Sequence, residues 1–428
     1  MYIHTIHLIL FFTVYNKLDL LYTKITLEFK KGENNCTMNA LYEIYLSIIC
    51  GSYSEELQKE YSSDILSMAL KHYTTPFICD YYMNNPCSLS NIKSQMKAII
   101  GNYYLFEQFT QLIVTLLKSN NIRHFLMKGI YLSECYEQPD TRKQGDVDIY
   151  IPNKADIKTA RKIFLENGFT LNDEFSSHHK EFIYNGTDGS KTLILELHYK
   201  VVDEYSYTPA NNVIKKVFSE DSLSDYSIMV NGYTYNVFPP TENAFYMLHH
   251  MLNHYMYSGF GIRLLLDYKA FLTHYNSEID YVLLKKWCSD SGILHFYEIV
   301  IHSLRLYLEL DDTIDSDTHY DKKICEHFIE KVLTDCDFGT NTGNSLINST
   351  SYKKITLLTY LKEGHHQMKM RFFKLHKVII LWPILWIITF ACFIKNNKYV
   401  RNTSFSEVID NFKTDNENIR MIKIFEDK

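Results

Sequence analysis

The spacing of apolar residues changes twice along this chain, and the changes limit the folds that it can adopt. From Met38 to about residue 120, apolar side chains recur at the three- and four-residue spacing of helices. Between Ile122 and Val237, short apolar runs with strand character alternate with helical segments. Beyond Pro240 the helical spacing returns. Strands and helices mixed within one such segment indicate an α+β core flanked by helical regions on both sides.

These changes divide the chain into five segments, because 428 residues exceed the usual size of a single core. We expect residues 38–120 to form an N-terminal helical region, 121–240 the core and 241–376 a C-terminal helical bundle. Residues 377–428 should hold an apolar helix and a polar tail. Residues 1–37 lack a core-facing stripe, and we expect them to be disordered or an extension upstream of a biological start at Met38.

Within the core, the pattern predicts a series of short elements. Gly168 and the Pro239-Pro240 pair mark two of their ends. The predicted strands are 122–127, 146–151, 180–184, 192–199 and 226–237, and the predicted helices are 130–136 and 154–167.

Charge and cysteine content exclude several function classes. The net charge of −6 gives no general attraction to a polyanion, so we expect no sequence-specific binding to nucleic acid. The nine cysteines are odd in number and form no Cys-x-x-Cys pair, which argues against a disulfide framework or a zinc ribbon. The N-terminal apolar stretch lacks the basic residues of an export signal. These features favour a cytoplasmic protein.

The segment from Gly145 to Ile151 places two carboxylates on one face of a predicted strand. Asp146 and Asp148 alternate with apolar residues, so both side chains project to the same side. Such a pair can chelate Mg²⁺ or Mn²⁺, the ions that phosphoryl transfer uses to neutralise triphosphate charge. A solvated polar face is the alternative, but aspartate is a poor strand former and like charges repel. The motif therefore favours a cation site.

Two further segments offer groups suited to a phosphate and to the metal. Lys128 and Gly129 lie where a predicted strand runs into a helix, a junction at which backbone amides and a lysine can approach phosphate. Glu196 and His198 lie on one face of a later strand, where Glu196 could be a third metal ligand or a general base. Each feature alone also fits a structural role, as a turn glycine or a solvated edge strand.

Together these segments resemble the uncharacterised nucleotidyltransferase family of the polymerase-beta-like superfamily. Its members carry a Lys-Gly turn, a Tyr followed by an Arg, an Asp-x-Asp strand, a later Glu-Leu-His, a His-rich helix and an Arg-x-x-x-Asp helix. The resemblance covers about residues 90 to 395 and implies a nucleotidyltransferase-like mixed sheet. The matching residues are Lys128-Gly129, Tyr136, Arg142, Asp146-Val147-Asp148, Glu196-Leu197-His198, His250, His254, Arg263 and Asp267.

The resemblance also implies an activity. A metal-dependent enzyme of this kind would move a nucleoside monophosphate from a nucleoside triphosphate such as ATP to a hydroxyl of an acceptor, which could be a small molecule or a protein. Asp146, Asp148 and Glu196 would be the catalytic and metal-binding carboxylates. Lys128, Gly129 and Arg142 would contact the nucleotide, and the candidates for lining the cleft are His198, His250, His254, Arg263 and Asp267.

Some of these matching residues also allow a second interpretation of their role. The superfamily's usual Gly-Ser turn is Gly129-Ile130 here, so a phosphate-binding hydroxyl is missing and a catalytically degenerate nucleotide-binding or partner-binding protein is the alternative. His250 and His254 have the spacing of a zinc site but lack the metalloprotease glutamate, so we expect core or cleft histidines. The i, i+4 spacing of Arg263 and Asp267 also fits a simple intrahelical ion pair.

An apolar segment near the C-terminus raises the question of membrane contact. Residues 378–394 are seventeen consecutive uncharged residues between basic flanks. At about 1.5 Å per residue they would span about 26 Å, less than a bilayer core of about 30 Å. We expect a helix, partly kinked by Pro383, that buries its apolar surface against the helical bundle. The basic flanks leave attachment to a membrane surface open.

Overall fold

The structure is a computed structural model in which the placement of most core residues is defined. The expectations for residues 1–37 and for most of the polar tail lie outside the described residues. The described residues are 40–399 and 425, apart from 52–57, 84–88, 173–175, 177, 186–190, 206, 258, 318–319, 336–363, 366–367, 370 and 373–374.

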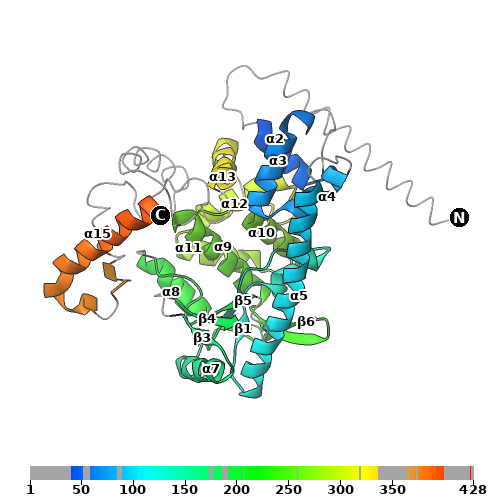
Figure 1. The fold of residues 1–428 in the computed structure, drawn as a ribbon. Helices are drawn as coiled ribbons and strands as arrows, with labels where there is room; N and C mark the ends of the chain where they lie inside the picture. The colour runs from blue at the N-terminus through cyan, green and yellow to red at the C-terminus, as the bar shows by residue number, and fades with distance from the viewer. Residues whose placement is uncertain are drawn as a thin grey trace.

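Four helices precede the sheet in the part of the chain that the structure describes, in line with the helical spacing of apolar residues there. The longest, α5, runs along one side of the molecule from the other N-terminal helices to the sheet (Figure 1). Its buried residues Ile92, Ile99, Phe106 and Ile113 recur at helical spacing and place one face of the helix in the core. The helices are α2 (Ala40–Ile49), α3 (Gln58–His72), α4 (Thr75–Met83) and α5 (Leu89–Ser119).

The described residues form one seven-stranded mixed sheet at the centre of the protein. Its strand order is β3-β4-β5-β2-β1-β7-β6. Strand β2 pairs with β1 in antiparallel and with β5 in parallel orientation, so it is covered on both edges. The strands are β1 (Phe125–Leu126), β2 (Val147–Tyr150), β3 (Thr170–Leu171), β4 (His179–Asn185), β5 (Thr192–His198), β6 (Tyr226–Val230) and β7 (Tyr233–Val237).

The sheet differs from the predicted elements in three places. The strand predicted at 226–237 is a hairpin of β6 and β7, because Asn231 and Gly232 both adopt positive φ, 49° and 79°, as a tight two-residue turn requires. Strand β3 and helix α8 (Thr208–Val217) were not predicted. The helices α6 (Ile130–Ser133) and α7 (Lys154–Glu166) confirm two predictions, although α6 is shorter than expected.

A second group of helices follows the sheet and packs at one end of it (Figure 1). Helix α9 buries residues on several sides, including Phe245, Leu248 and Leu252, so it lies inside the bundle. The fold class is thus the predicted one, an α+β protein whose mixed sheet is flanked by helical regions. The helices are α9 (Pro240–Tyr257), α10 (Ile262–His274), α11 (Tyr281–Asp290), α12 (Leu294–Leu308) and α13 (Lys322–Asp335).

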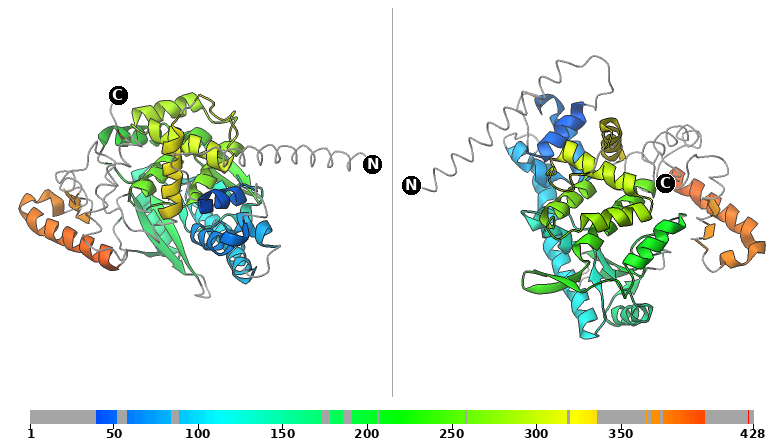
Figure 2. Two further views of the ribbon diagram at one scale, coloured as in Figure 1. Left: turned by 90° about the horizontal axis from the view of Figure 1, so that it is seen from above. Right: turned by 180° about the vertical axis from the view of Figure 1, so that it is seen from behind.

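The C-terminal apolar segment differs from its prediction. Helix α15 (Trp382–Tyr399) begins at the residue before Pro383, because proline is tolerated in a first helical turn, so the proline does not kink it. Figure 2 shows α15 at the periphery, apart from the α9–α13 bundle. The expectation of burial against the bundle is wrong: Ile384 and Ile387 are 57% and 69% exposed. Among the described residues, no helix is long and apolar enough to cross a membrane.

Candidate active site

The register of the central strands brings the predicted carboxylates together. Asp148 on β2 lies directly opposite Glu196 on β5, so both side chains project from the same face of the sheet. The other face is apolar, because Val147 and Leu195, which also pair, are buried in the core. On this polar face β4 adds His179, which is paired with His198 at the end of β5.

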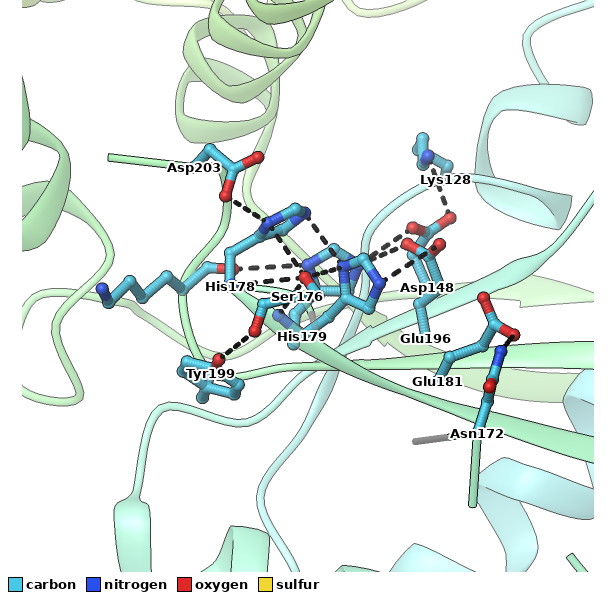
Figure 3. A network of polar contacts seen from close by, with 12 residues as sticks. Lys128, Asp148, Asn172, Ser176, His178, His179, Glu181, Glu196, Tyr199 and Asp203 are labelled. Carbon is cyan, nitrogen blue, oxygen red and sulfur yellow. Dashed lines mark hydrogen bonds and ion pairs between the residues drawn. The ribbon is translucent and has the colours of Figure 1, made fainter. Parts of the chain in front are cut away.

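Asp148 is the most enclosed of these carboxylates, with a residue exposure of 1%. Its Oδ2 lies 3.1 Å from Lys128 Nζ, and its Oδ1 lies 3.1 Å from Nε2 of His198 (Figure 3). The same His198 nitrogen is also 3.1 Å from Oε2 of Glu196, so one imidazole bridges two carboxylates. Lys128 reaches the site from the turn after β1, which Met127 N–H anchors by donating to Asp148 O.

These contacts set the charge of each group. Burial alone would lower the pKa of His198, but its hydrogen bonds with Asp148 and Glu196 outweigh burial and raise the pKa to about 9. Burial would raise the pKa of Glu196, yet the His198 hydrogen bond lowers it to about 2. Burial also opposes the charge of Lys128, but Asp148 holds its pKa well above the usual value. At neutral pH, Lys128 and His198 are therefore cations and Glu196 is an anion.

Asp146 is the carboxylate without a compensating charge. Burial and the neighbouring Asp148 charge raise its pKa above the ordinary value, despite the opposing charges of Lys128 and His198. Asp148 Oδ2, by contrast, already has the ammonium group of Lys128 at 3.1 Å. The raised carboxyl pKa of Asp146 is relieved by an added cation. The residues present therefore fit a divalent metal ion.

The carboxylate-containing group of residues whose possible metal-binding atoms lie close together differs by one residue from the predicted set of Asp146, Asp148 and Glu196. Asp148, Glu196 and His198 each offer an atom within 4.8 Å of the other two, whereas Asp146 is not part of this group. A second group with the same criterion consists of His178, His179 and His198. His178, just before β4, and His179, its first residue, were not predicted as site residues. A His-His pair at the start of a predicted strand was the available signal.

The two missed histidines are tied into the site by hydrogen bonds. His178 Nδ1 lies 2.8 Å from Asp203 Oδ1, and its Nε2 lies 3.0 Å from Nδ1 of His179. Nε2 of His179 is 3.6 Å from Oε1 of Glu196, and Ser176 Oγ is near both Nδ1 atoms. Burial lowers the pKa of His179 to about 4, so this ring is neutral near pH 7.

Arg142 is placed differently from the predicted nucleotide contact. Its guanidinium is buried and bidentate on Asp267, with Nε–Oδ1 and Nη2–Oδ2 distances of 2.8 and 2.9 Å. Asp267 also accepts from Tyr136 Oη at 2.7 Å and lies 3.5 Å from Arg263 Nη1. Burial would raise the pKa of Asp267, but the Arg142 charge and hydrogen bonds outweigh it and lower the pKa. We therefore assign Arg142 to positioning.

This ion pair reaches the turn that carries Lys128. Arg142 Nη1 donates to Gly129 O at 3.3 Å, and Gln144 Nε2 donates to Ser133 Oγ at 2.6 Å. Asp267 on α10 thus helps, through Arg142, to hold the turn at Gly129 that follows β1.

Two of the predicted cleft histidines, His250 and His254, lie on α9. Their rings are 4.5 Å apart between centroids and nearly perpendicular. Burial, and then the charge of Lys128, hold the pKa of His250 well below the ordinary value. His250 is therefore neutral. It lies close enough to Lys128 for the charge of the lysine to act on it.

Gly129 adopts a conformation that other residues avoid, which leads to a prediction. Its φ of 66° and ψ of −123° lie in a region open almost only to glycine. We expect Gly129→Ala to lower the free energy of unfolding by about 1–3 kcal/mol through backbone strain. Gly101→Ala is the control, because Gly101 is helical with open space around it, and alanine there should stabilise by about 0.5–1 kcal/mol. Denaturant unfolding measures both, and equal effects would contradict the strain.

Comparison of the chain with sequence models of protein families gives a match. A sequence model of the uncharacterised nucleotidyltransferase family matches residues 63–309, more than half of the chain and every candidate residue of the site. No curated protein matches the chain.

Two solved structures show weak similarity. An antigenic nucleotidyltransferase-like protein from Paracoccidioides brasiliensis is 13% identical, with 49% of this chain and 96% of that chain covered and a TM-score of 0.32. A nucleotidyltransferase candidate from H. pylori is 16% identical, with 54% and 96% covered and a TM-score of 0.29. At these values the assignment rests on the family match alone. By that match, the chain belongs to the uncharacterised nucleotidyltransferase family.

Proposed function

We propose that this protein is a metal-dependent nucleotidyltransferase that moves a nucleoside monophosphate from a nucleoside triphosphate to an acceptor hydroxyl and releases pyrophosphate. Membership of the family supports nucleotidyl transfer in general. The observation that supports the metal dependence is the buried pairing of Asp148 with Glu196 across β2 and β5, beside an uncompensated Asp146. Such a cluster of hard oxygen atoms suits Mg²⁺ or Mn²⁺.

Each group has a role that follows from its surroundings. Asp146, Asp148 and Glu196 would hold the ion, which when bound neutralises triphosphate charge and aligns the reacting oxygens. A carboxylate with a pKa of about 2 is a weak base, so the metal-ligand role suits Glu196 better than proton abstraction.

Lys128 is the cation available to the triphosphate. Its side chain is 17% exposed, and its ammonium group is held 3.1 Å from Asp148 Oδ2 by the Gly129 turn. A fixed positive charge next to the carboxylates can contact a phosphate oxygen without reorganisation, which is how preorganised sites stabilise developing charge.

The test is a transfer assay with each of the four labelled ribonucleoside triphosphates, with and without Mg²⁺ or Mn²⁺. Candidate acceptors are sugars, hydroxyl-bearing antibiotics and proteins. We expect metal-dependent pyrophosphate release and label on one acceptor class. If no triphosphate binds in the presence of either ion, the proposal is wrong.

A second candidate function is nucleotide binding without turnover. It is favoured by Ile130, which follows Gly129 where the superfamily's turn carries serine and which is fully buried. No hydroxyl reaches a phosphate from this position. Metal-dependent nucleotide binding without transfer to any acceptor would favour this function over the enzyme.

We propose, in addition, that the protein works in the cytoplasm at a lipid surface. Aliphatic side chains before and on α15 are exposed, with Ile379 at 69% and Ile380 at 84%, and Lys369 and Arg371 nearby are exposed cations. An apolar face with adjacent basic residues suits the interface of an anionic bilayer.

Sedimentation with vesicles tests this contact. We expect the full chain to bind vesicles of phosphatidylcholine and phosphatidylserine, and Ile380→Asp with Ile387→Asp to weaken binding at least 100-fold, since each buried aliphatic side chain contributes about 1.5–3 kcal/mol. Val282→Asp, at an 82% exposed position on α11, is the matched control. Binding that survives the double substitution, or its absence in the parent chain, would exclude this surface.

A further inference from the structure

Three histidine rings gather beside the carboxylates. His178 immediately precedes β4, His179 is the first residue of β4, and His198 is the last residue of β5. Their ring centroids are 4.4, 5.3 and 5.1 Å apart, and one ring nitrogen of each lies within 4.8 Å of the others. Their side chains are only 19%, 14% and 4% exposed. The pairing of His179 with His198 across two strands makes this a rigid arrangement.

When His178 and His179 are both neutral, the form in which imidazole binds a metal ion, their ring nitrogens cannot all be satisfied by hydrogen bonds. A neutral imidazole has one N–H donor and one lone pair. Asp203 Oδ1, at 2.8 Å, accepts a hydrogen bond from His178 Nδ1–H, which leaves a lone pair on Nε2 of His178. His179 Nδ1, 3.0 Å away, can donate to that lone pair. The lone pair of His179 Nε2 then faces Glu196 Oε1 at 3.6 Å, so two electron-rich atoms oppose each other.

A cation among these atoms would remove the conflict. We propose that His178, His179 and His198 form a binding site for a transition-metal ion of the Zn²⁺ class, adjacent to the carboxylate site. Imidazole nitrogens select Zn²⁺ and related ions, whereas Mg²⁺ prefers oxygen atoms. Figure 3 shows Asp203 on the outer side of His178, the position of a carboxylate that orients a metal-binding histidine.

The proposal rests on the histidine geometry and not on nucleotidyl transfer. Because His198 also contacts Asp148 and Glu196, its substitution would alter both ion sites and could not separate them. Of the two groups of possible ligands, His178 and His179 belong only to the histidine group. His179 also lies 3.6 Å from Oε1 of Glu196, so substitution of His178 is the more selective test of the Zn²⁺ site.

The experiment is isothermal titration calorimetry of Zn²⁺ into the full chain without a polyhistidine tag, paired with visible absorption of the Co²⁺ form. We expect one equivalent to bind, with the Co²⁺ bands of a nitrogen-rich site. His178→Gln and His179→Gln should each abolish the Co²⁺ bands. Asp203→Asn, which keeps the side-chain shape, should weaken Zn²⁺ binding about 10–100-fold.

Two controls make the outcome decisive. His274→Gln, at an exposed histidine on α10, should bind Zn²⁺ like the parent chain. Asp146→Asn should also keep the Co²⁺ bands, although it is expected to lose Mg²⁺-dependent nucleotide binding, so that the two proposals fail separately. Thermal melting verifies that each variant is folded. Zn²⁺ binding that is absent from the parent, or unchanged in His178→Gln and His179→Gln, would overturn the site.

Discussion

Replacing Asp146 by asparagine is expected to remove Mg²⁺-dependent nucleotide binding while leaving the metal-free fold at least as stable as the parent. The pKa of Asp146 is raised by burial and by Asp148, so its ionised form opposes folding at neutral pH and a neutral amide relieves that cost. The same charge is what attracts the ion. A bound ion would stabilise the charge of the transition state by about 4 kcal/mol. Its loss would therefore lower the rate of nucleotidyl transfer roughly 10³-fold.

Asp148→Asn should behave in the opposite way in the absence of metal. This carboxylate compensates both Lys128 and His198 in a buried site, so its loss leaves two charged groups without their partner. We expect Asp148→Asn to destabilise the protein by about 1–3 kcal/mol. Asp221→Asn, at an exposed position, is the matched control.

Nucleotide titrations with and without Mg²⁺, together with thermal melting of the metal-free protein, measure these effects. Unchanged Mg²⁺-dependent affinity in Asp146→Asn would exclude Asp146 from the ion site. A melting temperature of Asp146→Asn well below that of Asp148→Asn would show that the charge balance described for the site is wrong.

The sheet and its polar face could be predicted from local patterns. Alternation along β2 and β5 indicated which side chains share a face, and the structure places Asp148 opposite Glu196 on that face. The hairpin at Asn231-Gly232 was also predictable, because this dipeptide favours positive φ at both positions, but it was read as one strand. Local rules therefore suffice where the signal lies within one strand or one turn.

The contacts that complete the site could not be predicted from local patterns. His179 reaches Glu196 and His198 only through the register of β4 on β5. Arg142 meets Asp267 across a sequence separation of 125 residues, and nothing near Arg142 distinguishes an ion pair from a phosphate contact. The surface against which an apolar helix face packs is equally hard to predict from local sequence, because it depends on which part of the folded protein lies nearby. That is why the burial of α15 was predicted wrongly.

The buried ion pair of Arg142 and Asp267 leads to the prediction with the largest expected effect on stability. Asp267 is 1% exposed and compensates the Arg142 guanidinium through two short hydrogen bonds. Asp267→Ala would leave that cation buried without its anion, a change that costs about 3–5 kcal/mol. Glu166→Ala is the control, because its ion pair with Lys162 is exposed and is worth at most about 0.5 kcal/mol.

The double variant Arg142→Met with Asp267→Leu separates the stabilising role of the pair from its positioning role. Replacing both charges by apolar side chains of similar volume is often neutral, so part of the stability lost in Asp267→Ala should return, although Tyr136 Oη still lacks its acceptor. Nucleotide affinity should not return, because the double variant still lacks the hydrogen bond from Arg142 Nη1 to Gly129 O, which holds the turn carrying Lys128. Denaturant unfolding and nucleotide titration of the same samples measure the two quantities. If affinity recovers together with stability, Arg142 does not position Lys128, and the ion pair serves the fold alone.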